Sequence, residues 1–142
     1  MQTFLPDPSY ATSASMLDYR RLGKQRVETK QILLALGKSK GGWVNHPATK
    51  MWRGHELELS TYGLAMCKEW VERGYNDTLG QYFLAMRDAY EAEGHPSIPP
   101  PWLGDEVFHA SHRSNLLRKD PVFYAQYGWS EAPDLPYVWP VE

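Results

Sequence analysis

Apolar residues repeat at helical spacing through the middle of this 142-residue chain, and this pattern most limits the fold it can adopt. Met51, Leu59, Tyr62, Met66 and Val71 keep one helical period, which ends at a glycine suited to a helix C-terminus. No segment shows the alternation of apolar and polar residues that is typical of a strand. We therefore predict an all-α protein.

Capping and helix-breaking residues divide the chain into about four predicted helices in a compact bundle. Gly54 and Gly63 are candidate break points within the second of them. The proline-rich stretch 95–104 cannot be helical, and we interpret it as a rigid strap across the core. An aromatic segment and an extended, proline-rich C-terminal tail follow residue 121. The predicted helices span about residues 14–36, 47–73, 78–93 and 105–119.

Chain length and composition favour one domain over residues 1–142, since the apolar content is 42% and suffices for a core. Cys67 is the only cysteine, so no internal disulfide can form and a reducing cytoplasm is expected. We expect no signal peptide and no membrane-spanning segment, because no basic region precedes an apolar run and no apolar run is long enough. We also expect a monomer.

The stretch 17–28 carries the most distinctive charge pattern. Arg20, Lys24 and Glu28 follow one another at intervals of four, so in a helix they line one face. A carboxylate at the end of a cationic track suits a protein that holds a polyanion and then acts on it. The alternative interpretation is a solvated helix face with ordinary Lys–Glu pairs.

Charge is distributed unevenly along the sequence. The whole chain has a formal net charge of −2, which is not typical of a nucleic-acid binder. Residues 18–30 nevertheless hold five cations and two carboxylates, a net charge of +3, whereas residues 88–106 hold five carboxylates and no Lys or Arg. One cationic face on an acidic protein is therefore expected.

Other kinds of site find little support in the sequence. His109 and His112 are three residues apart, but no second cysteine, His-Glu-x-x-His motif or carboxylate pair completes a metal site. No glycine-rich loop follows a strand, and Cys67 fits a core position. We predict no metal and no cofactor. Basic residues together with aromatic ones are typical of nucleic-acid binding, so DNA is the expected partner.

Several blocks of the sequence resemble the pyrimidine-dimer DNA glycosylase family, also called the endonuclease V family. The resemblance runs from residue 1 to about residue 128, and it is greater to an actinobacterial and phage branch that shares RLGKQRVE and SHRSNLLRKDP. The blocks lie at residues 17–28, 42–47, 72–76 and 116–121, with Tyr124 and Tyr127 after the last.

This resemblance implies a compact helical DNA repair enzyme with glycosylase and AP lyase activities. In the family, an N-terminal α-amine attacks the sugar C1′ to give a Schiff base, and a glutamate assists. The matching groups here are the Met1 amine and Glu28, and bulky Gln2 is expected to keep Met1 in place. The predicted DNA contacts are Arg20, Arg21, Lys24, Arg26, His46, His112, Arg113 and Lys119.

The sequence departs from the phage enzyme at two informative positions. Gln2 replaces a small second residue, and Val27 replaces an arginine directly before the glutamate. Two alternatives therefore stay open beside a glycosylase acting on a damaged base. One is a non-catalytic DNA-binding protein of the same fold, and the other is an enzyme acting on hypermodified bases in phage DNA.

Overall fold

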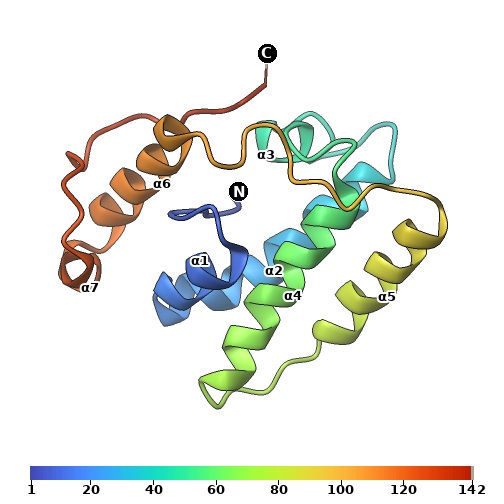
Figure 1. Ribbon diagram of the computed structural model, residues 1–142, viewed down its shortest axis with the longest axis horizontal. Helices are drawn as coiled ribbons and strands as arrows, with labels where there is room; N and C mark the ends of the chain where they lie inside the picture. Colours follow the sequence, from blue (N-terminus) through green and yellow to red (C-terminus); the bar gives the residue numbers. More distant parts are fainter. Residues whose placement is uncertain (142) are drawn as a thin grey trace.

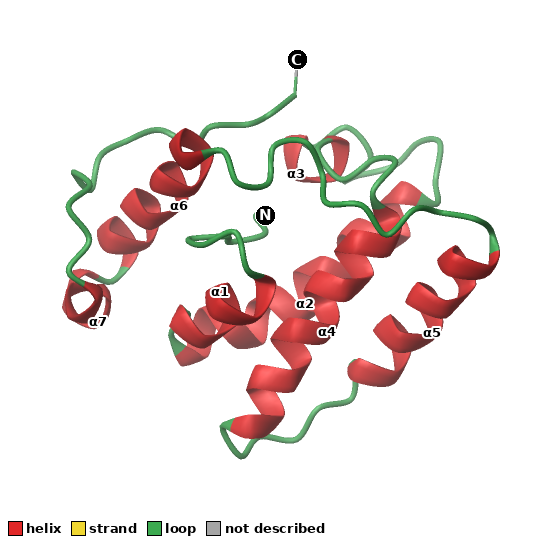
Figure 2. Ribbon diagram, viewed as in Figure 1, coloured by secondary structure: helices red, strands yellow, loops and turns green. Residues whose placement is uncertain are grey.

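The computed structural model describes residues 1–141. Its regular secondary structure is entirely helical, with no strand in that range (Figure 2), which confirms the predicted all-α class. It has seven α-helices where about four were predicted, because two predicted helices are broken and a short one follows the fourth. The helices are α1 (Tyr10–Met16), α2 (Tyr19–Leu36), α3 (Pro47–Lys50), α4 (Glu56–Glu72), α5 (Gly80–Ala92), α6 (Glu106–Lys119) and α7 (Pro121–Tyr124), followed by a 3₁₀ turn at Ala125–Tyr127.

The predicted first helix breaks at Leu17 and Asp18, where the backbone is extended. Asp18 is buried and exchanges two hydrogen bonds with Tyr124 of α7. Its N–H donates to the Tyr124 hydroxyl (3.0 Å), and that hydroxyl lies 2.5 Å from the Asp18 carboxylate. A partner 106 residues away thus overrides the local helical preference, and α2 begins at the residue after Asp18.

The predicted second helix also divides, at Gly54, whose positive φ of 86° stops α3 from joining α4. Pro47 opens α3, and His46 caps it by accepting a hydrogen bond from the Ala48 N–H (3.0 Å). Gly63 does not break α4. A Cβ on this residue would lie 2.6 Å from the Phe83 ring, so the glycine allows α4 and α5 to pack closely.

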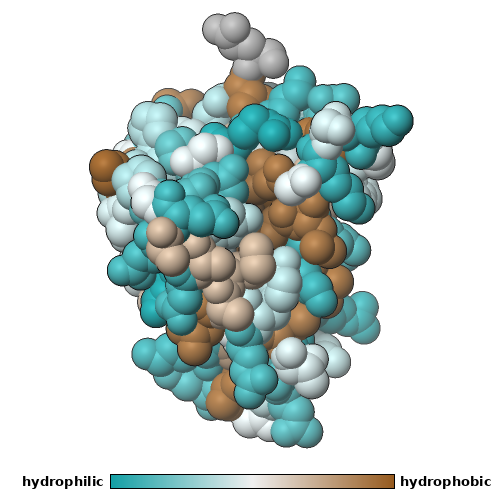
Figure 3. Space-filling view, turned by 90° about the vertical axis from the view of Figure 1, so that its right-hand side faces the viewer, coloured by the Kyte–Doolittle hydropathy of each residue, from teal (hydrophilic) through white to brown (hydrophobic). Residues whose placement is uncertain are grey.

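The core forms around α4, which packs against α1, α2 and α5 (Figure 1). The largest fully buried side chains of this core include Trp52, Tyr62 and Phe83. The proline-rich segment lies over this core as the predicted strap, with Trp102 donating a hydrogen bond to the Met51 carbonyl (3.1 Å). On the α5 side of the molecule, apolar patches alternate with hydrophilic side chains (Figure 3).

The N-terminal segment is extended and lies between α2 and α6 (Figure 1). Residues 2–6 are all buried, although no strand pairs with them in the described structure. Side chains from four helices or their flanking loops hydrogen-bond this segment instead. No helix within residues 1–141 is long and apolar enough to cross a membrane.

Candidate active site

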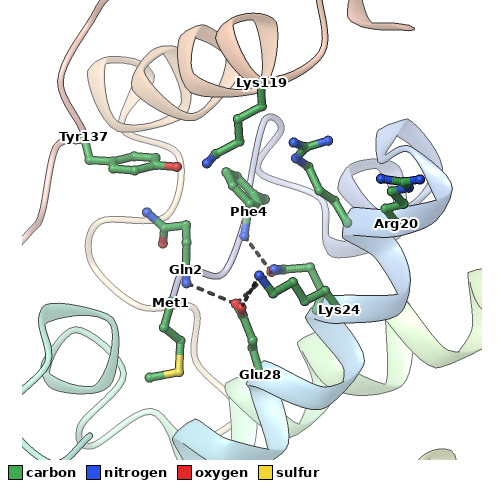
Figure 4. Close-up of a pocket in the computed structure, with 10 residues that line it drawn as sticks. Met1, Gln2, Phe4, Arg20, Lys24, Glu28, Lys119 and Tyr137 are labelled. Carbon is green, nitrogen blue, oxygen red and sulfur yellow. Dashed lines mark hydrogen bonds and ion pairs between the residues drawn. The ribbon is translucent and has the colours of Figure 1, made fainter.

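A pocket of about 410 Å³ lies where the N-terminal segment meets α2, the end of α6 and the C-terminal tail (Figure 4). This volume is in the range of small-ligand sites, roughly 300–1,000 Å³. Four of its ten lining residues carry cationic side chains. The lining residues are Met1, Gln2, Phe4, Arg20, Arg21, Lys24, Gln25, Glu28, Lys119 and Tyr137.

The α2 side of the pocket is the charged stripe predicted from the sequence. Arg20, Lys24 and Glu28 all line the pocket, as their spacing on one helical face predicts. Lys24 Nζ lies 3.8 Å from Glu28 Oε1. The Lys24 side chain is 73% exposed and that of Glu28 only 13%, so the carboxylate is the inner group and the ammonium the outer one.

Glu28 is held by the N-terminal segment as well as by its own helix. Its Oε2 accepts a hydrogen bond from the backbone N–H of Gln2 (3.2 Å) and lies 3.5 Å from Gln25 Nε2. Three bonds separate the Met1 amine nitrogen from the Gln2 nitrogen, which places the amine within about 7 Å of the same carboxylate oxygen. Met1 also lines the pocket. The amine and Glu28 therefore share one site.

Two side chains from the core hold Phe4 in register with α2. Gln25 is 1% exposed, and its Oε1 accepts a hydrogen bond from the Phe4 N–H (2.9 Å). The buried Tyr62 hydroxyl lies 2.9 Å from the Phe4 carbonyl and 2.8 Å from Gln25 Oε1. These contacts fix the segment that carries the amine.

Two buried histidines of α6 bracket the next residue, Leu5. The Leu5 N–H donates to His112 Nδ1 (2.9 Å), and its carbonyl lies 2.7 Å from His109 Nδ1. His109 Nε2 accepts a hydrogen bond from the Gly104 N–H (2.9 Å), so its Nδ1 carries the proton and donates to Leu5. The Leu5 N–H therefore needs a neutral His112, whose Nδ1 must keep a lone pair to accept this bond.

The far wall of the pocket comes from α6 and the tail. Partial burial, with the nearby charges of Arg21, Arg118 and Lys24, lowers the pKa of Lys119. Burial raises the pKa of Tyr137 to about 12, so its hydroxyl stays protonated at neutral pH. The Tyr137 ring lies 6.3 Å from that of Phe4, and both present aromatic surface to the pocket.

The structure brings six of the ten predicted site residues to this pocket. These are Met1, Glu28, Arg20, Arg21, Lys24 and Lys119. His46 lies nearby, since partial burial and the charge of the N-terminus lower its pKa while Glu28 acts in the opposite direction. Its ring packs between Trp43 and Trp139, which are 5.4 and 5.8 Å away between ring centroids.

Three of the predicted DNA contacts have other roles in the fold. His112 is fully buried and holds the Leu5 N–H, so its ring does not reach the surface where DNA would bind. Arg26 is also buried and pairs with Asp77 at 2.6 Å, which ties α2 to the start of α5. Arg113 is paired with Glu106 and Glu131 and donates to the Pro6 carbonyl (2.9 Å). The charges of Arg26 and Arg113 are paired within the protein, whereas the buried Nε2 of His112 has no partner among the described residues.

Sequence reasoning missed the pocket roles of Gln2, Gln25 and Tyr137. Gln25 carried a local signal, because it precedes Glu28 by three residues and shares its helical face. Tyr137 carried none, since only tertiary folding brings the tail to α2. Within residues 1–141, no three His, Cys, Asp or Glu side chains cluster closely enough to hold a metal ion.

Comparison with known proteins identifies the family of this chain. The family model described as pyrimidine dimer DNA glycosylase matches residues 1–83, which include the N-terminal segment and all of α2. No curated protein and no solved structure matches the chain. The match covers more than half of the sequence and contains Met1 and Glu28. The chain therefore belongs to the pyrimidine dimer DNA glycosylase family.

Proposed function

We propose that this protein is a DNA glycosylase with associated AP lyase activity, in which the Met1 amine is the nucleophile and Glu28 assists it. The observation that supports this most strongly is the shared pocket. The segment carrying the amine donates its first peptide N–H to the Glu28 carboxylate at 3.2 Å. Covalent catalysis of this kind needs a nucleophile with an adjacent group that can take up its proton.

The proposed reaction begins with attack of the uncharged amine on C1′ of the damaged nucleotide. A nitrogen–carbon bond forms as the glycosidic bond breaks, and the base leaves with the bonding electron pair. The proton released by the alkylated amine passes to Glu28. Glu28 returns this proton to the ring oxygen as the sugar ring opens to a Schiff base, and it then takes up a C2′ proton as the 3′ phosphate is expelled. Glu28 also stabilises the positive charge that develops on the sugar.

The cations around the pocket have a separate role in this proposal. Arg20 and Lys24 on α2 and Lys119 on α6 stand on opposite sides of the pocket (Figure 4). Such groups neutralise phosphates on either side of a nucleotide that has entered the site. We propose that DNA binds here to a monomer.

A Glu28→Gln variant tests the proposal. Two duplexes serve as substrates, one with a single thymine cyclobutane dimer and one with an abasic site. We expect Glu28→Gln to slow glycosidic-bond cleavage and strand cleavage by about 100-fold or more. DNA affinity should be equal or higher, because a carboxylate has been removed from a cationic pocket. Glu72→Gln, an exposed change on α4, is the control.

Other outcomes favour the alternatives. Salt-sensitive DNA binding with no product from either duplex indicates a non-catalytic DNA-binding protein. Product formed only from phage DNA that carries hypermodified bases indicates a base-editing enzyme. Wild-type rates retained by Glu28→Gln on both duplexes would contradict the proposed role of the carboxylate.

A further inference from the structure

Gln2 carries a hydrogen-bond donor that the fold does not use. Its side chain is 5% exposed, and its Oε1 accepts a hydrogen bond from the Thr3 N–H (2.9 Å). Because an N–H must face an acceptor, this bond fixes which end of the amide is oxygen. The other end, Nε2, is buried and has no partner among the described residues. Buried donors are nearly always paired, so an unpaired one in a pocket wall points to a ligand.

The position of this amide relates it to the reacting atoms. Gln2 directly follows Met1 and lines the same pocket as Glu28. Its backbone N–H donates to the carboxylate, while its side chain extends away from Glu28 toward Tyr137 (Figure 4). The amine, the carboxylate and the unpaired amide therefore belong to residues that line one pocket.

We infer that Gln2 Nε2 donates a hydrogen bond to a carbonyl oxygen of the pyrimidine that leaves C1′. This inference rests on the proposed function. The glycosidic nitrogen of a pyrimidine is bonded to C1′, and the C2 carbonyl is next to that nitrogen. Because the amine attacks C1′ on the face opposite the leaving base, the inference places the Gln2 amide on the far side of C1′ from the amine.

The proposed hydrogen bond would stabilise the negative charge that develops on the leaving base. The base departs with the pair from the broken glycosidic bond, and its negative charge is shared between the ring nitrogen and the carbonyl oxygen. A fixed donor at that oxygen stabilises the transition state more than the neutral ground state. An abasic site has no base, so the same donor contributes nothing to strand cleavage there.

Access to this donor involves the C-terminal tail. Nε2 is covered in the structure, so a base must enter between the N-terminal segment and Tyr137. The tail at this point is extended, and a hydrogen bond from the Val138 N–H to Ser111 Oγ (3.1 Å) attaches it to α6.

The test uses Gln2→Met, which removes both amide donors at similar size and, with them, the oxygen that accepts from the Thr3 N–H. A bulky second residue also keeps Met1 in place, and the backbone N–H that Glu28 accepts is unchanged. Glycosidic-bond cleavage is measured under single-turnover conditions on the thymine-dimer duplex, with alkali used to convert every abasic site into a break. Strand cleavage is measured in parallel on the abasic duplex. Gln81→Met, an exposed change on α5, is the matched control.

We expect Gln2→Met to slow glycosidic-bond cleavage at least about tenfold more than it slows abasic-strand cleavage. Gln2→Glu lacks the amide donors but keeps an oxygen that can accept from the Thr3 N–H, so it provides a second variant that separates the two losses and also serves if Gln2→Met does not fold. An equal loss on both duplexes, or no loss on either, would overturn the inference, since the side chain would then only support the terminus or do nothing.

The wild type separates this inference from the proposed function. If it cleaves neither duplex, the proposed function fails and the role of Gln2 fails with it. If it cleaves the abasic duplex but not the dimer, the assignment to a pyrimidine carbonyl is overturned while the lyase stands. If it cleaves both and Gln2→Met matches it, only the role of Gln2 is lost.

Discussion

Arg26 and Lys24 are two residues apart on α2 and have opposite surroundings. Lys24 is an exposed cation at the pocket, whereas Arg26 is buried against Asp77 and packs over the Trp70 ring at 4.7 Å. Burial alone would raise the pKa of Asp77, but the hydrogen bonds from Arg26, Leu79 and Gly80 outweigh it and lower that pKa. The pair thus has a structural role.

Replacing Arg26 by Ala should therefore reduce stability and leave DNA affinity unchanged. The change removes the charged partner of the partly buried Asp77 carboxylate, which keeps only its bonds from the Leu79 and Gly80 N–H groups, and such a loss typically costs about 1–3 kcal/mol. Urea unfolding measures the loss, and Asp77→Asn added to Arg26→Ala should recover part of it. A fall in DNA affinity without a fall in stability would contradict this assignment.

At this scale the sequence predicted the pocket cations better than the buried ones. Spacing identified Arg20, Lys24 and Glu28 as one face because the helical period alone fixes their direction. It could not show that Arg26 would meet Asp77, since that contact depends on how α2 packs against the start of α5. Histidines posed the same difficulty, and His112 lies in the core.

Among the secondary-structure elements, the extended N-terminal segment depends on α6 for its position. Burial lowers the pKa of His112 to about 3, and the neighbouring His109 acts in the same direction, while a histidine in the unfolded chain titrates near pH 6.5. Between these values the unfolded chain binds a proton that the folded protein does not. The stability is therefore complete above about pH 6.5 and decreases as the pH falls.

This linkage predicts a measurable loss of stability in acid. At pH 5 it amounts to about 2 kcal/mol relative to pH 7.5. His112→Asn keeps an acceptor near the position of Nδ1 and cannot titrate, so it should lack this part of the pH dependence. Urea unfolding at both pH values gives the comparison, and the difference between the two proteins removes contributions from other groups. Identical pH dependence in both would contradict the prediction.

Helix boundaries were predictable where the signal was local. Pro47 and Asp105 open helices as their side chains dictate, and the Asp105 carboxylate accepts from the Val107 N–H (3.1 Å). The break at Asp18 was not predictable, because Tyr124 causes it from the other end of the chain. Gly23 lies against the Trp70 ring, which would be 2.9 Å from a Cβ added to this glycine. This contact also depends on tertiary packing and has no local signal.

At the scale of the whole molecule, the net charge conceals a separation of charges. The pocket cations lie on α2 and α6, and the acidic stretch 88–106 lies along the end of α5 and the strap (Figure 1). Both ends of the chain build the pocket, although the family match stops at residue 83. We propose that the whole chain is a single domain for this reason.

Charge separation predicts how DNA binding responds to salt. Lys24→Gln should weaken binding and reduce the slope of log affinity against log salt by about 1, since one phosphate contact is lost. Lys68→Gln, an exposed change on α4, should alter neither quantity. Fluorescence anisotropy with a labelled duplex at several salt concentrations measures both. Equal effects of the two changes would argue against DNA binding at the pocket.

The central claim is that the Met1 amine and Glu28 act together in the cationic pocket, and borohydride trapping tests it most directly. The protein is incubated with an abasic duplex and borohydride, and the adduct is digested and located by mass spectrometry. The account predicts one adduct, on the α-amine of the peptide that begins at Met1. An adduct on Lys24 or Lys119, or no adduct while the DNA is bound, would contradict it.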